Sequence, residues 1–428
     1  MRYALTHATV LDGTKDMEPK ENVTVLVDGE KIVDVTAGPA PSGFEEVDLG
    51  GRFLMPGLIN MHVHLAGNGK PQKKQRDNTK LVKTIFGNPI GPKVAHALVA
   101  EYARIELMSG VTTVRTVGGL RDLDTRVRDE IASGKRLGAR ILASNEGISV
   151  PGGHMAGSVA VPAESIPQAV SLVRKVNAQH VDLVKLMITG GVMDAKAKGV
   201  PGELKMDPTM VRACCDEAHK LGYLVAAHVE SPQGVRVALE NGVDSIEHGA
   251  KPDADTMDLF LSRGAFLTTT ISPALPYALF DQSVSNASDV ERFNGNVVFE
   301  GIIDCARAAL ASGVPVALGN DVGCPWITQY DFWRELVYFR HYVGASRALA
   351  LHTATLGNAT LAGIGGETGS VEAGKCADLV VCAENPLEDL RALRHVDMIM
   401  ARGNLVRNPK VSRNAKVDAE LNKYLPEG

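Results

Sequence analysis

The sequence has few cysteines and no pattern that indicates a disulfide framework. It contains six cysteines in 428 residues, two of them adjacent at Cys214 and Cys215, and no C-x-x-C pair. This usage excludes a small secreted scaffold held together by disulfides. We therefore expect the protein to reside in a reducing cytoplasm.

Long apolar runs and a strong charge of one sign are also missing. No apolar run reaches the roughly 18 residues of a membrane span, and the start, MRYALTHATVLDG, does not read as a signal peptide. The formal net charge of −5 provides no electrostatic footprint for nucleic acid. With 45% hydrophobic and 22% charged residues, the chain is expected to form a large domain with a sizeable core and a smaller domain.

Both ends of the chain are predicted to be rich in strands. Residues 1–55 contain short alternating runs with many turns, and Asp28-Gly29 is a hairpin signal. Residues 361–428 return to the same pattern of strands and glycine turns. We therefore expect one small β unit that is built from both termini.

The middle of the chain, residues 56–360, alternates apolar strand-like runs with helical segments. One such helix is DPTMVRACCDEAHKLG, with Asp207 as its N-cap. The strand candidates are GLINMHVHL, VTTVRTVGG, ARILASNEG, VDLVKLMIT, LVAAHVE, SIEHG, AFLTTTIS and VPVALGND. Eight such units predict a (β/α)8 barrel. A doubly wound open sheet is the alternative, but no G-x-G-x-x-G follows the first strand.

The first predicted barrel strand contains two histidines, His62 and His64, one residue apart. Residues i and i+2 of a strand point to the same face, so both imidazoles project together. Two imidazoles on one face of a buried strand indicate a metal ion. The alternative is a pair of core histidines that are satisfied by hydrogen bonds.

Polar side chains also end four later strands: Lys185, His228, His248 and Asp321. Taken singly, each histidine could be a satisfied core residue, the lysine could be paired, and the aspartate could cap a helix. Barrel strands, however, all end at the face where active sites lie. We therefore expect these four residues to converge with the two histidines of the first strand.

This set of residues suits hydrolysis by two divalent metal ions, with zinc as the expected ion. Two cations need more negative charge than Asp321 alone supplies. The amine of Lys185 can react with CO2 to give a carbamate, which would present one oxygen to each ion. A hydroxide shared by the ions would attack a polarised carbonyl, while Asp321 moves the proton from water to the leaving group.

These residues, the segment MPGLINMHVHL and the tail TGSVEAGKCADLVV closely resemble the amidohydrolase superfamily over nearly the whole chain. TTVRTVGG and PGGHMAG look like its imidazolonepropionase-related branch, which includes prolidases, carboxypeptidases and ochratoxinase-like amidases. The resemblance implies a (β/α)8 barrel, a flanking β-sandwich, and a carboxylated Lys185 that bridges two metal ions. It also implies that one ion is held by His62, His64 and Asp321, and the other by His228 and His248.

The sequence departs from the family pattern at two places. Asn60 stands where the common motif has aspartate, and Glu230 stands where prolidase-like relatives often have tyrosine. If Glu230 faces the pocket, it favours a cationic or hydrogen-bond-donating group of the substrate. The alternative is that its side chain points outward.

Three further features are candidates for contact with the substrate. His154, in SVPGGHMAG, could polarise the substrate carbonyl or bind a carboxylate, or be a loop histidine in water. Arg115 could clamp a carboxylate or form a structural ion pair. The segment 67–83 holds six basic residues and one acidic residue, and could be a mobile lid or a solvated surface loop.

The leading hypothesis is thus an enzyme that cleaves an amide or peptide bond of a dipeptide, N-acyl amino acid or similar small molecule. The alternatives are a deaminase, a hydrolase of cyclic amides and a non-catalytic scaffold. One-metal deaminases often carry H-x-x-E on the fifth strand, whereas this chain has a spacing of two between His228 and Glu230. The scaffold relatives have lost metal ligands, and none of the six is missing here. Because such barrels often assemble, we expect a homo-oligomer.

Overall fold

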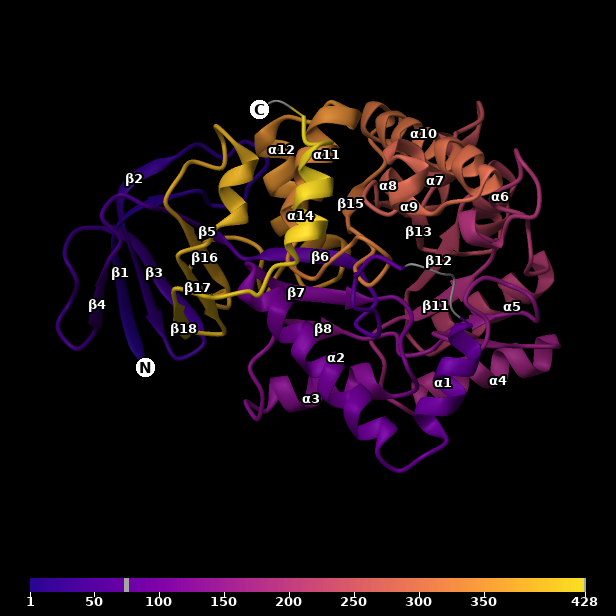
Figure 1. Ribbon diagram of the computed structural model, residues 1–428. Coiled ribbons are helices and arrows are strands. Elements are labelled where there is room, and N and C mark those ends of the chain that lie inside the picture. Colours follow the sequence, from indigo (N-terminus) through magenta and orange to yellow (C-terminus); the bar gives the residue numbers. More distant parts are fainter. Residues whose placement is uncertain (73–76, 427–428) are drawn as a thin grey trace. The chain divides into compact units, whose positions relative to one another are not determined.

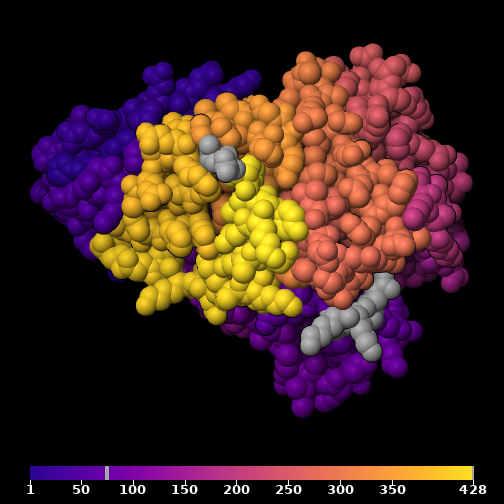
Figure 2. Space-filling view, turned by 45° about the horizontal axis from the view of Figure 1, so that its top comes forward, coloured from indigo at the N-terminus to yellow at the C-terminus, as the bar shows by residue number. Residues whose placement is uncertain are grey.

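The two ends of the chain pair with each other in one mixed sheet. The computed structural model describes residues 1–72 and 77–426, and the sheet is eight-stranded within these residues. Figure 2 shows the two ends of the chain, in indigo and yellow-orange, side by side. The strands of this sheet are β1 (Arg2–Val10), β2 (Lys20–Asp28), β3 (Lys31–Ala37), β4 (Glu45–Asp48), β5 (Phe53–Pro56), β16 (Leu379–Cys382), β17 (Met398–Ala401) and β18 (Asn404–Arg407).

Strand β5 joins the N-terminal and C-terminal parts of this sheet. It runs parallel to β1, with Thr9 opposite Phe53, and antiparallel to β16, with Val380 opposite Met55. β2 and β3 form the predicted hairpin after Asp28, and Gly29 adopts the positive φ of +59° that this turn requires. The sheet buries its own apolar core, which includes Leu5, Val25, Val27, Leu379 and Val381.

The middle of the chain forms the predicted (β/α)8 barrel. Each of the eight predicted strand segments contains one of its strands: β6 (Leu58–Val63), β7 (Val111–Thr116), β8 (Arg140–Leu142), β11 (Val184–Met187), β12 (Val225–Val229), β13 (Ser245–His248), β14 (Phe266–Thr269) and β15 (Val316–Leu318). β11 to β15 pair in parallel and in chain order. Of two further short strands, β9 (Gly147–Ser149) pairs with β11, and β10 (Ala160–Pro162) pairs with β9.

Single contacts connect the strand groups of the barrel. Val63, at the end of β6, forms a bridge with Val322 after β15. On the other side, the Asp182 backbone N–H, just before β11, donates to the Ala143 carbonyl oxygen, just after β8, at 2.7 Å. In a barrel of this kind the C-terminal ends of the strands share one face, which is where active sites lie.

Helices alternate with the barrel strands (Figure 1). They are α1 (Asn78–Phe86), α2 (Gly91–Met108), α3 (Leu123–Ala132), α4 (Ile166–Asn177), α5 (Pro208–Lys220), α6 (Pro232–Glu240), α7 (Thr256–Arg263), α8 (Leu275–Leu279), α9 (Gln282–Ser285) and α10 (Asp289–Ser312). Four further helices follow the barrel: α11 (Phe332–Tyr338), α12 (Arg347–His352), α13 (Asn358–Leu361) and α14 (Ala415–Asn422). α5 begins as predicted, because Asp207 accepts a hydrogen bond from the Thr209 N–H at 2.8 Å.

The chain divides into two units. One contains Met1–Met61, Arg104–Val114 and Tyr330–Gly428, and the other contains His62–Ala103 and Arg115–Gln329. All residues of the candidate site lie in the second unit. The domain limits expected from the sequence, 1–55 with 361–428 and 56–360, stay a prediction. In the described ranges, no helix has the length and apolar composition that a membrane span requires.

Candidate metal centre

The six strand-end residues meet in one cavity of about 280 Å³. They are His62, His64, Lys185, His228, His248 and Asp321. Each of them except His64 is at most 7% exposed. Because buried imidazoles, amines and carboxylates are costly unless they are satisfied, this cluster requires either a network of partners or a bound cation.

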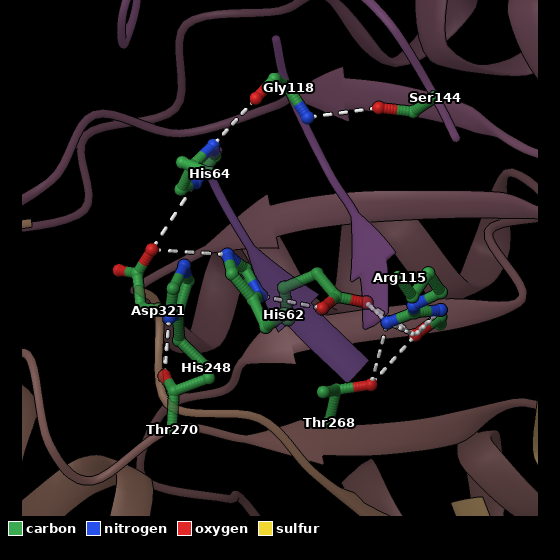
Figure 3. Close-up of polar contacts among 11 residues, drawn as sticks. His62, His64, Arg115, Gly118, Ser144, His248, Thr268, Thr270 and Asp321 are labelled. Carbon is green, nitrogen blue, oxygen red and sulfur yellow. Dashed lines mark hydrogen bonds and ion pairs between the residues drawn. The ribbon is translucent and has the colours of Figure 1, made fainter. Parts of the chain in front are cut away.

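His62 in β6 and His64, the first residue after this strand, are oriented by hydrogen bonds at Nδ1 (Figure 3). His62 Nδ1 donates to Glu247 Oε2 at 2.7 Å, and His64 Nδ1 donates to the Gly118 carbonyl oxygen at 2.8 Å. The Nε2 atoms of both rings face Asp321 Oδ1, at 3.5 Å and 3.2 Å respectively. Hydrogen bonds of this kind fix the tautomer of metal-binding histidines.

The histidines of β12 and β13 are held in the same way. His228 donates from Nε2 to the Gly190 carbonyl oxygen at 3.2 Å, and His248 Nδ1 lies 2.7 Å from Thr270 Oγ1. The rings of His228 and His248 are 4.7 Å apart, as are those of His62 and His248. In each ring the nitrogen that is not used in these bonds remains to serve as a ligand.

The protonation of these histidines also suits a metal site. Burial lowers the pKa of His62 to about 4 and lowers those of His228 and His248 well below the ordinary value. They are therefore neutral near pH 7, which is the form that binds metals. Burial acts to raise the pKa of Asp321, but His62 and His64 bring it well below its usual range, so this carboxyl is ionised.

Two of the candidate ligands have left-handed backbone conformations. His248 has a φ of +69° and Asp321 a φ of +57°. Such strain costs about 1–3 kcal/mol per residue and is concentrated at functional sites. It turns both side chains into the cavity at points where the strands end.

Gly319, directly after β15, lets strand β6 approach closely. A Cβ atom on Gly319 would lie 2.4 Å from the Cβ of His62. Only glycine fits there, because real Cβ contacts are never this short. The glycine thus permits the spacing between His62 and Asp321.

Whether these residues fit two metal ions depends on the chemistry of the Lys185 amine. Its side chain is 1% exposed, and its Nζ has no hydrogen-bond partner among the described residues. Burial lowers the pKa of Lys185 to about 8, which increases the fraction of neutral amine. An amine without a hydrogen-bond partner among the described residues, which loses its proton more readily than an exposed lysine, is suited to carbamate formation. Together with four imidazoles and a carboxylate it gives a donor set that fits the group.

Arg115 does not line the cavity. Its Nη2 donates to Glu247 Oε1 at 2.7 Å and to Thr268 Oγ1 at 3.1 Å, on the side of His62 away from Asp321 (Figure 3). Of the two roles considered for Arg115, the structure shows the ion pair. Burial acts to raise the pKa of Glu247, but Arg115 and then His62 bring it well below its usual range. Arg115 therefore keeps the Glu247 carboxylate ionised, and this carboxylate orients His62.

We expect Arg115→Met to destabilise the fold by about 3–5 kcal/mol, because it leaves the Glu247 charge buried without its cation. Urea unfolding of the apoprotein measures this change. In the double variant Arg115→Met/Glu247→Gln the charge is removed as well, so most of the loss should be recovered. A loss of unfolding free energy below about 1 kcal/mol in the single variant would show that Arg115 is not needed to compensate the buried charge of Glu247.

His154 lies at the cavity and is paired with an aspartate that the sequence analysis did not identify. Its Nδ1 is 2.5 Å from Asp194 Oδ2, and its ring stacks on His228 at 4.0 Å and 5°. Asp194 ends the short helix Val192–Asp194 and also accepts from the Gly191 N–H at 2.9 Å. The pairing leaves His154 Nε2 as the nitrogen available to a substrate.

Glu230 also lines the cavity, so its side chain takes the inward of the two orientations considered. Its Oε2 accepts a hydrogen bond from the Val192 N–H at 3.1 Å. Its ligand atom lies within 4.8 Å of those of His228 and His248. In the absence of a cation, burial and then the charge of Asp321 raise the pKa of Glu230 to about 8.

The outer wall of the cavity is mostly apolar. Helix α1 contributes Leu81, Val82 and Ile85, and Met155, Met193 and Pro273 are among the other lining residues. Among the described lining residues, Lys185 is the only lysine or arginine. Residues 73–76 of the basic segment 67–83 lie outside the described residues, and the lid hypothesis stays a prediction.

Some functional residues had weak signals in the sequence. Glu247 is an acid inside the apolar strand SIEHG, and a buried acid must have a partner. Asp194 and Cys324, which lines the cavity beside Asp321, carry no comparable signal. Their positions depend on the paths of the loops after β11 and β15.

Comparison with known proteins agrees with this geometry. The chain is similar to a solved structure from Bifidobacterium longum described as a candidate prolidase, with 36% identity, 99% of this chain and 98% of the other covered, and a TM-score of 0.86. It is also similar to the structure of a Xaa-Pro dipeptidase with bound methionine in the active site, with 28% identity, 95% and 100% coverage, and a TM-score of 0.83. Ochratoxinase of Aspergillus niger is 24% identical over 84% of this chain and 76% of its own length. Residues 53–406 match the family model described as "Amidohydrolase family". The chain therefore belongs to the amidohydrolase family.

Proposed function

We propose that this protein is a metal-dependent hydrolase that cleaves an amide or peptide bond of a small molecule. The observation that carries the proposal is the buried, unpartnered amine of Lys185 among four oriented histidines and an ionised aspartate. A site with one metal ion would leave this lysine without a role. Two divalent ions, with zinc as the expected metal, and a carbamate on Lys185 explain why it is there.

The residues divide into two ligand sets in this proposal. His62, His64 and Asp321 would hold one ion, His228 and His248 would hold the other, and a carbamate on Lys185 would supply anionic oxygens to the centre. When bound, the ions lower the pKa of a water molecule and polarise the scissile carbonyl. Asp321 then accepts the proton of the attacking water and delivers it to the leaving amine.

His154 and Asp194 act on the substrate side of this site. The ionised Asp194 carboxylate accepts a hydrogen bond from His154 Nδ1 and stabilises the imidazolium form of the ring. In that form, the Nε2–H can donate to the carbonyl oxygen of the substrate. Negative charge develops on this oxygen during attack, and a fixed donor stabilises it. His154 is then a catalytic residue, and Asp194 is a positioning residue.

We expect Asp194→Asn to lower kcat by about a hundredfold while both ions stay bound, because the donor loses its orientation and charge support. Steady-state kinetics and metal analysis of the same sample measure this split. Asp216→Asn, at an exposed position of α5 in the same unit, is the matched control. A change in KM alone would show that His154 binds substrate without acting on the carbonyl.

The apolar wall supports a substrate with an apolar side chain beside the scissile bond. Leu81, Val82 and Ile85 of α1 offer such a surface, whereas the described wall offers no arginine to a second carboxylate. The similar Xaa-Pro dipeptidase was solved with methionine in its active site, which is a side chain of this class. Dipeptides and N-acyl derivatives of apolar amino acids are therefore the proposed substrates.

A release assay tests the proposal. Zinc-loaded protein is incubated with pooled dipeptides, N-acyl amino acids, lactams and aminated heterocycles, and the products are identified by mass spectrometry. Release of a free amino acid from an amide is expected. Release of ammonia from a ring without amide cleavage would contradict the proposal and favour a deaminase. The cytoplasmic location and the homo-oligomeric state are likewise proposals.

A further inference from the structure

Glu230 is the carboxylate of the cavity that the proposed mechanism does not use. It follows His228 by two residues at the end of β12, and both side chains line the cavity. His62 and His64 have this same i, i+2 relation at the end of β6, and the proposed function assigns both of them to one ion. Two strands of the barrel are therefore each followed or ended by a pair of potential ligands that line the same cavity.

The ligand atoms of Glu230, His228 and His248 form one group. All three lie within 4.8 Å of one another. Atoms that bind the same zinc ion at about 2.1 Å lie at most about 4.2 Å apart, so small side-chain movements would bring all three onto one ion. The ligand atoms of His62, His248 and Asp321 form a second such group, so His248 lies within reach of both.

The surroundings of Glu230 hold its carboxylate in this place. The Val192 N–H binds Oε2 at 3.1 Å, and the Glu230 N–H donates to Thr189 Oγ1 at 3.0 Å. A Cβ on Gly191 would lie 3.3 Å from Oε2 and 3.2 Å from His154 Cε1. The glycine thus leaves room for both side chains, and a backbone donor orients the carboxylate as in other metal-binding acids.

Charge balance favours the same role. In the proposed centre, the anionic protein ligands assigned to the two divalent ions are Asp321 and the Lys185 carbamate. A third carboxylate in the cavity reduces the remaining positive charge. We infer that Glu230 is a third protein ligand of the ion held by His228 and His248. This inference rests on the proposed function, because it requires a two-metal centre.

Metal titration of the full chain tests this role without relying on activity. Apoprotein is titrated with zinc in bicarbonate buffer against a chromophoric chelator, and bound ions are counted by mass spectrometry. We expect the unmodified protein to bind two ions. Glu230→Gln should keep the tighter ion and bind the second one about tenfold to a hundredfold more weakly. Glu203→Gln removes an exposed carboxylate near the same strand ends and should behave like the unmodified protein.

A second variant and cobalt spectroscopy guard against a folding defect. Glu230→Asp keeps the charge but shortens the reach, so its second ion should be bound with intermediate affinity. With cobalt in place of zinc, Glu230→Gln should change the visible absorption of the second ion added and leave that of the first unchanged. Spectra and affinities equal to those of the unmodified protein in both variants would overturn the inference.

The remaining outcomes separate this inference from the proposed function. If the unmodified protein binds fewer than two ions, the two-metal centre is wrong and the inference fails with it. If it binds two ions and Glu230→Gln binds them equally well, only the ligand role of Glu230 is wrong. Unchanged metal affinity together with a raised KM for a substrate that bears an ammonium group would assign Glu230 to substrate binding instead.

Discussion

Lys185→Ala is expected to remove at least one metal ion and to lower turnover by about a thousandfold or more, which corresponds to roughly 4 kcal/mol of lost transition-state stabilisation. Alanine cannot form the carbamate that connects the two ions in our proposal. The fold should survive, since the amine has no hydrogen-bond partner among the described residues and its loss breaks no such bond. Metal content and kcat are measured on the same bicarbonate-treated preparation.

The matched control for this variant is Lys220→Ala, at the exposed end of α5. It should retain both ions and full activity. If Lys185→Ala also retained full activity with two ions, the bridging role of Lys185 would be wrong. The neutral imidazoles would then have to hold the ions with Asp321 and Glu230 alone.

Asp321→Asn is expected to lower kcat by about a hundredfold to ten-thousandfold, the range that a positioned acid–base group contributes. The amide keeps the size of the side chain and an oxygen that faces His62 and His64, but it cannot accept the proton of the attacking water. Asparagine also tolerates the left-handed backbone at this position, so the loop should keep its path. kcat, metal content and thermal stability are measured together.

The pattern of these three quantities determines the role of Asp321. A large loss of kcat with both ions bound indicates proton transfer. A loss of metal in parallel with kcat shows that its main role is as a ligand. An unchanged kcat would exclude Asp321 as the group that accepts the proton.

Much of the centre could be predicted from the sequence because the barrel imposes its own geometry. Parallel strands of a closed barrel end at one face, so polar residues that end apolar strands must meet there. This reasoning predicts from the sequence alone that His62, His64, Lys185, His228, His248 and Asp321 converge, and all six line one cavity. Alternation along a strand explains why two histidines at i and i+2 point the same way.

The residues around the centre were harder to assign because they depend on loop paths and on depth in the barrel. Arg115 could clamp a substrate carboxylate or form a structural ion pair, and the sequence does not distinguish these roles. The structure does, because the guanidinium lies beside Glu247. Glu230 lies just beyond β12, where alternation no longer fixes the direction of a side chain. Asp194 reaches His154 only because the segment after β11 turns at Gly191.

One measurement tests the central claim most directly: a crystal structure of the protein treated with zinc and bicarbonate, with anomalous scattering recorded at the zinc edge. We predict two peaks, one beside His62, His64 and Asp321 and one beside His228 and His248. Electron density for a carboxylated Lys185 should lie between them. A single peak with an unmodified Lys185 would contradict the account.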